Sequence, residues 1–183
     1  MNRLLITSVL VLGLSSLGFA EEETDPGGEL NPDEMSLSSS LAKAGRGQVN
    51  MVICSQGYFL TKKGDHEEAR ALFEECAKQG WTGTMTWMSY MEQNGYGAPE
   101  NPERAAAWDK RAAELGDPIG MFNHGLDLLR GYGVEQNETL GRSYIDRAAS
   151  AGVKSAQELQ EGGYDPELVT PDADQWKFEK RLY

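Results

Sequence analysis

The feature that most constrains the fold of this chain is an internal repeat. Short segments recur 36 positions apart: Gly95–Gly97 with Gly131–Gly133, Ala112-Ala113 plus Gly116 with Ala148-Ala149 plus Gly152, and Cys76-Ala77 plus Gly80 one offset earlier. A period in the thirties with small residues at fixed positions is typical of stacked helix pairs, each of which buries its apolar face only against its neighbours. We therefore expect an all-α helical-repeat solenoid of about three helix pairs.

Turn and cap signals divide the second copy into two helices. The first is expected from about Gly83 to Asn94, and the Gly-Tyr-Gly segment then reverses the chain. Asn101 is a good N-cap with Pro102 at the first helical position, and Gly116 ends the second helix.

The other two copies begin helices with related signals. In the third copy, Asp117-Pro118 repeats the cap-and-proline device. In the first copy, Asp65 followed by Glu68 predicts a capping box at the start of the second helix.

The positions that recur within the copies carry a family resemblance. The segments Ser89–Gly116 and Gly125–Gly152 share a small residue, Gly-Tyr-Gly, an aromatic residue, Ala-Ala and Gly in order, a pattern that resembles the Sel-one-like repeat (SLR), a relative of the tetratricopeptide repeat. The first copy is shorter between Gly57 and Cys76 and has ordinary tetratricopeptide spacing, while Gly141 replaces the usual alanine and predicts a weaker helix. The resemblance covers about residues 46–160 and implies a fold, but such arrays serve many partners.

The N-terminal residues are typical of export. Residues 1–20 combine Arg3, an apolar run from Leu4 to Leu14 and small residues before a cleavage point after Ala20. The alternative is an uncleaved anchor, although the run is shorter than the about 18 residues of a membrane span. We expect a periplasmic or secreted protein in which residues 21–45 form a flexible acidic leader.

The residues after the repeats, 161–183, form a tail with a possible capping helix. Trp176, Phe178 and Leu182 could cover the apolar end of the array or form a docking peptide for a partner.

Charge and cysteine content limit the possible partners and the cellular compartment. The net charge of −12 argues against nucleic acid as a partner and, after signal cleavage, against direct membrane insertion. Cys54 and Cys76 are the two cysteines, and an oxidising compartment favours a disulfide between them, the alternative being two buried thiols.

The sequence contains no group of residues that predicts catalysis. His66 and His124 are far apart and without carboxylates or cysteines at metal-ligand spacing, so we interpret both as structural or surface residues. We accordingly predict a non-enzyme without cofactor or metal site.

The remaining candidate site is the concave side of the array, lined by the first helix of each pair. Transferring tetratricopeptide positions predicts these protein-binding residues: Tyr58, Lys62, Thr86, Tyr90, Asn94, Phe122, Leu126 and Arg130. For Phe122 and Leu126 the alternative is packing against a neighbouring helix or the tail.

The function predicted from these features is that of a periplasmic scaffold, adaptor or regulator that binds an envelope protein. The resemblance to the SLR family implies one alternative, a cell-wall-directed enzyme acting in β-lactam or peptidoglycan hydrolysis. The acidity and size of the chain allow another, a small inhibitor or immunity-type protein.

Overall fold

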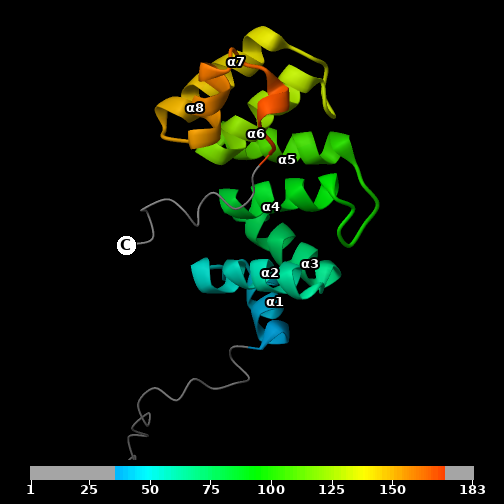
Figure 1. Cartoon of the computed structure of the whole chain (residues 1–183). Helices are drawn as coiled ribbons and strands as arrows, with labels where there is room; N and C mark the ends of the chain where they lie inside the picture. The colour runs from blue at the N-terminus through cyan, green and yellow to red at the C-terminus, as the bar shows by residue number, and fades with distance from the viewer. Residues whose placement is uncertain (1–35, 172–183) are drawn as a thin grey trace, which may run out of the picture. The chain divides into compact units, whose positions relative to one another are not determined.

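The computed structural model describes residues 36–171, and this part of the chain is helical without a β-strand (Figure 1). The all-α repeat architecture expected from the sequence is confirmed. The elements are α1 (Leu37–Gly45), α2 (Met51–Lys63), α3 (His66–Lys78), α4 (Thr82–Gln93), α5 (Pro102–Glu114), α6 (Pro118–Arg130), α7 (Glu138–Ser150), α8 (Lys154–Glu161) and the 3₁₀ turn η1 (Pro166–Leu168).

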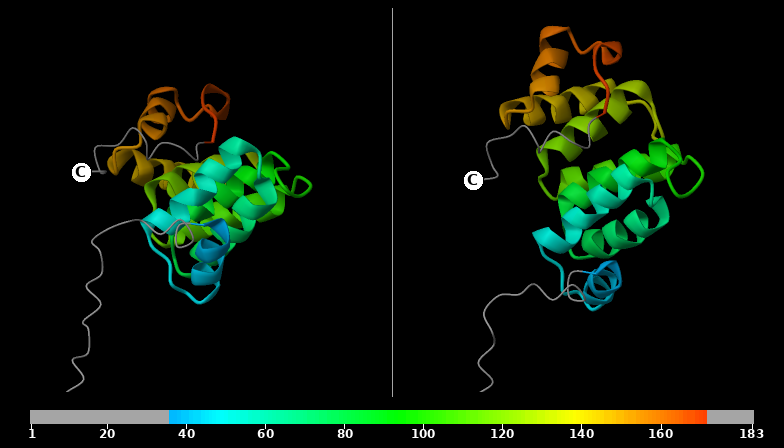
Figure 2. Two further views of the ribbon diagram at one scale, coloured as in Figure 1. Left: turned by 90° about the horizontal axis from the view of Figure 1, so that it is seen from below. Right: turned by 60° about the horizontal axis from the view of Figure 1, so that its bottom comes forward.

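The helices from α2 to α8 pack in chain order, each against the next. Figure 1 and the two views of Figure 2 show this succession. The pairs α2–α3, α4–α5 and α6–α7 correspond to the three copies, and α4 also contacts α6. We call the side formed by the first helices of the pairs, α2, α4 and α6, the A face.

The predicted caps are present in the second and third copies but not in the first. The side chain of Asn101 accepts a hydrogen bond from the Arg104 N–H, and Asp117 caps α6 in the same way. The capping box predicted at Asp65 is wrong. Its carboxylate lies 2.6 Å from the Lys63 ammonium and accepts no cap hydrogen bond, and the Asp65 backbone, with φ −80° and ψ 64°, lacks the extended conformation of a usual N-cap.

Each Gly-Tyr-Gly turn contacts the preceding copy of the repeat. A Cβ on Gly133 would lie 2.0 Å from the Pro102 carbonyl oxygen, and one on Gly97 would lie 3.0 Å from the His66 carbonyl. His66 and Pro102 are themselves 36 positions apart, so both turns press against the start of the preceding copy's second helix. Since both glycines also have positive φ, 64° and 72°, the repeat requires glycine there.

Gly141 does not shorten its helix. Both α5 and α7 contain 13 residues, so the predicted weakening of α7 is not seen in its length. A Cβ on Gly141 would lie 3.0 Å from the Gly125 carbonyl oxygen, and one on Gly125 would lie 3.0 Å from that of Gly141. The glycine therefore lets α6 and α7 approach closely.

The two ends of the described chain differ from expectation. Residues 37–45, assigned to a flexible leader, form α1, because Ser36 caps the helix and Ala44 is buried with Ile53 and Leu72. At the other end α8 closes the array, with Val153, Ala156 and Leu159 in the core of the third copy. The expected signal peptide, residues 21–35, and Trp176, Phe178 and Leu182 lie outside the described residues.

A disulfide joins Cys54 of α2 to Cys76 of α3, the pair favoured by the sequence. Both residues are buried, and the bond ties the two helices of the first copy together. None of the helices described by the structure is both long enough and apolar enough to span a membrane.

Candidate protein-binding surface

Aromatic side chains from two copies meet on the A face. The ring of Tyr58 in α2 lies edge-on to that of Trp87 in α4, with centroids 5.4 Å apart, and Trp87 makes a similar contact with Tyr90, also at 5.4 Å. The Lys62 ammonium lies 5.3 Å from the centre of the Tyr58 ring and 5.7 Å from that of Trp87. We call Tyr58, Lys62, Trp87 and Tyr90 the aromatic surface.

Helical spacing explains why these side chains converge. Tyr58 and Lys62 are four residues apart in α2, and Trp87 and Tyr90 are three apart in α4, so each pair shares one face of its helix. Trp87 is 4% exposed and forms the floor, whereas Tyr58 and Tyr90 are half-buried. Large rings with a cation among them can bind apolar and aromatic side chains of another polypeptide.

The aromatic contacts continue at both ends of this surface. Phe59, which is 66% exposed, contacts the Tyr58 ring at 5.4 Å. On the other side Tyr90 contacts Tyr96, and Tyr96 stacks on His66 with centroids 4.6 Å apart. Rings therefore run without a break from α2 to the first Gly-Tyr-Gly turn.

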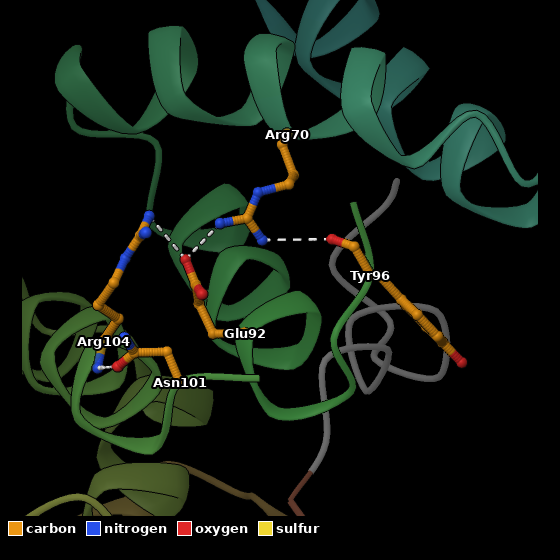
Figure 3. A network of polar contacts seen from close by, with 5 residues as sticks. All are labelled: Arg70, Glu92, Tyr96, Asn101 and Arg104. Carbon is orange, nitrogen blue, oxygen red and sulfur yellow. Dashed lines mark hydrogen bonds and ion pairs between the residues drawn. The ribbon is translucent and has the colours of Figure 1, made fainter. Parts of the chain in front are cut away.

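A buried ion network holds that turn in place (Figure 3). The fully buried Glu92 of α4 accepts from Arg70 of α3 at 2.5 Å and pairs with Arg104 of α5 at 2.8 Å. Arg70 also donates to the Tyr96 carbonyl at 3.3 Å. Because a buried charge needs close partners, this network fixes the three helices and the Tyr96 turn together.

A second polar cluster joins α4, α5 and α6. The carboxylate of Asp109 accepts hydrogen bonds from Ser89 and from Asn123, the latter at 3.1 Å. Burial raises the pKa of Asp109, and burial together with the charge of Asp109 raises the pKa of Asp127. The cluster lies inside the array and serves its packing.

The A face of the third copy is occupied by the chain itself. Arg130 donates to the carbonyls of Pro166 at 2.5 Å and Val169 at 2.7 Å. Val169 has extended backbone, φ −136° and ψ 160°, and is buried in the cluster that contains Phe122 and Leu126. Figure 1 shows this last described segment passing α6.

The comparison with known families identifies the repeats. The family model of the Sel1 repeat matches residues 40–81, 84–117 and 118–153, more than half of the chain. The chain belongs to the Sel1 repeat family. Proteins built from Sel1 repeats generally mediate protein–protein interactions.

Two solved structures have a similar fold. A Sel1 repeat protein from Oxalobacter formigenes is 22% identical, with a TM-score of 0.53, over 72% of this chain and 92% of that one. A protective antigen present in uropathogenic Escherichia coli strains, which displays an SLR fold, is 18% identical with a TM-score of 0.51 over 78% of this chain. The match covers 36% of the antigen, so this chain corresponds to about a third of its length.

Five of the eight predicted binding residues are exposed or half-buried, and they lie in three different settings. Tyr58, Lys62 and Tyr90 come together in the aromatic surface. Asn94 is exposed at the end of α4, where its side chain donates to the Tyr90 carbonyl at 2.7 Å. Arg130 holds the segment after η1.

The remaining three predictions are wrong as surface assignments. Thr86 is 2% exposed, and Phe122 and Leu126 are fully buried. The hydroxyl of Thr86 donates back to the Gly83 carbonyl, which keeps it within its own helix. Phe122 and Leu126 are buried in one hydrophobic cluster with Val169 and with Ile145 and Ala148 of α7.

Both histidines have packing roles, as expected. His66 stacks on Tyr96, and His124 packs edge-on to Tyr144 with centroids 5.0 Å apart. Burial lowers the pKa of His124 to about 4, so its imidazole is neutral at pH 7.

Sequence reasoning missed Trp87 as the floor of the aromatic surface, Phe59 and Tyr96 as the rings at its two ends, and Glu92 as the centre of the ion network. Tyr96 was interpreted only as a turn residue. Glu92 follows Met88 by four residues, so a charge at the helical spacing of a core residue was the available signal.

Proposed function

We propose that this Sel1 repeat protein is an envelope adaptor that holds an extended segment of a protein partner on the aromatic surface. One observation carries the proposal: Tyr58, Lys62 and Tyr90, which come from two copies, all contact the buried Trp87 ring. Aromatic residues dominate the affinity of many protein interfaces, since rigid rings bury much area at little entropic cost.

The third copy supports an extended segment as the ligand. There Arg130 donates to two backbone carbonyls, and Val169 packs its apolar side chain in extended conformation. Backbone hydrogen bonds combined with side-chain pockets are a general mode of peptide recognition.

Two features of the chain support a partner in the cell envelope. The signal-like residues 1–20 and a disulfide suit an oxidising compartment outside the cytoplasm. The mass of the protein isolated from the periplasm gives its N-terminus, and we expect Glu21. A protein that begins at Met1 in a cytoplasmic fraction contradicts this assignment.

Cross-linking in the living cell tests the function directly. A photoreactive amino acid in place of Phe59, at the edge of the aromatic surface, should capture one protein that mass spectrometry identifies. The same probe in place of Glu74, on the second helix of the first copy, is the control. Equal capture from both positions, or capture from Glu74 alone, argues against the aromatic surface.

A further inference from the structure

The described chain ends on the A face. After η1 the segment crosses α6, held by Arg130 at Pro166 and Val169. The last described residue is Pro171, and residues 172–183 follow it. The point from which these residues start is therefore fixed beside the third copy.

The repeat shows what the segment after η1 covers. Leu126 lies 36 positions after Tyr90, and Tyr58 holds the same place in the first copy, one residue after Gly57 as Tyr90 is after Ser89. Arg130 likewise corresponds to Asn94 and to Lys62. The surface that Val169 covers in the third copy is thus the one that the aromatic residues form in the first two.

The length of the remaining chain is sufficient to reach those copies. Extended chain spans roughly 3.3–3.6 Å per residue, so Trp176 can reach about 17 Å from Pro171 and Phe178 about 24 Å. Packed helices lie about 8–10 Å apart, so one such step from α6 to α4 and a second toward α2 are shorter than these two reaches.

The chemistry of residues 172–183 matches the aromatic surface. Trp176 and Phe178 have rings of the kind that can pack on Tyr90 and Tyr58, and Glu179 has a carboxylate of the kind that can pair with Lys62. These residues are not needed to close the end of the array, because α8 already does so with Val153, Ala156 and Leu159.

We propose that residues 172–183 continue along the A face and place Trp176 and Phe178 against the aromatic surface, so that the protein occupies its own binding site until a partner displaces this segment. The inference rests on the proposed function for its regulatory meaning. The occupancy itself is a separate claim about this chain alone.

Photocross-linking of the purified full chain tests the occupancy. With p-benzoylphenylalanine in place of Phe178, we expect cross-links within one chain to peptides of α2 or α4. The double change Tyr58→Ala with Tyr90→Ala should lower their yield at least about fivefold, since it removes the rings that hold the segment. The same probe in place of Leu168, beside Gly162, should cross-link to α8 as the positive control.

Three results would contradict the proposal that residues 172–183 occupy the A face. Cross-links to α7 or α8 mean that the tail covers the end of the array. Cross-links only between two chains mean that a second copy takes up the segment. A successful Leu168 control with no cross-link from position 178 means that the A face does not hold the tail.

Partner binding separates this inference from the proposed function. If a partner competes with the segment, Trp176→Ala with Phe178→Ala should tighten its binding about three- to tenfold, because a larger fraction of the protein is open. Cross-links to α2 and α4 without any effect of Tyr58→Ala on partner binding support the occupancy and reject the function. Partner binding that depends on Tyr58 without such cross-links supports the function and rejects the occupancy.

Discussion

Tyr58 and Trp87 belong to different copies of the repeat, yet their rings meet edge to face with centroids 5.4 Å apart. The contact joins α2 to α4 directly, across the face formed by the first helices. A surface made in this way depends on how the copies stack, so changes in the stacking should alter binding as well as stability.

The disulfide is the first feature that can be checked. Intact mass with and without alkylation should show a Cys54–Cys76 bond in protein isolated without a reducing agent. Replacing both cysteines by serine should lower the free energy of unfolding by about 3 kcal/mol, because the closed loop constrains the unfolded chain. Alkylation of both thiols in untreated protein contradicts the bond.

The turn glycines should differ sharply in their tolerance of alanine. Gly133→Ala places a Cβ 2.0 Å from the Pro102 carbonyl at positive φ, and we expect a loss of roughly 3 kcal/mol or more. Gly116→Ala, also at positive φ but in open space, should cost only about 1–2 kcal/mol. Urea unfolding followed by circular dichroism measures both, and equal losses would show that the turn does not set the spacing of the copies.

Removal of one charged member of the ion network around Glu92 should strongly destabilise the folded protein. Glu92→Ala leaves the Arg70 guanidinium, which is 9% exposed, without its carboxylate and should cost about 3–5 kcal/mol. The double change Glu92→Met with Arg70→Met should recover much of that loss, since it buries no unpaired charge. A double variant less stable than Glu92→Ala would mean that side-chain volume, not charge, dominates here.

The buried carboxyl of Asp127 should make stability depend on pH. Its pKa is raised by burial and by the charge of Asp109, so above about pH 4, where an unfolded carboxyl ionises, the folded protein keeps a proton that the unfolded chain has lost. The stability that the Asp127 carboxyl contributes to the fold therefore falls as pH rises above about 4. Asp127→Asn should gain stability relative to wild type as pH rises from about 4 to about 8, by an amount on the order of 1–3 kcal/mol. A difference that shrinks with pH contradicts the raised pKa.

The repeat made most of the fold and part of the surface predictable. Tyr58 and Tyr90 followed from the resemblance to the tetratricopeptide repeat combined with the register of the copies, because equivalent positions of a helix pair face the same way. Phe122 occupies a predicted surface position but is buried in a cluster that includes Val169, a residue beyond the last copy that no repeat register can place.

The buried polar contacts were also less predictable, because they join residues that are distant in the sequence. The pairing of Arg70 with Glu92 joins residues 22 apart that lie on different helices, and no local pattern links them. The helix α1 was missed because it is a short, Ser-rich helix of nine residues, too short to be stable alone, and its stability depends on burial of Ala44 against the next helices.

The central claim is that the aromatic surface binds the partner, and Tyr90 tests it most directly. Isothermal titration of the partner identified by cross-linking should give a dissociation constant weakened about thirtyfold by Tyr90→Ala, which corresponds to about 2 kcal/mol. Tyr90→Phe should keep nearly wild-type affinity, and the melting temperature of both variants should stay within a few degrees of wild type, since Tyr90 is half-buried at the surface of the array. A folded Tyr90→Ala variant that binds as tightly as wild type would contradict the claim.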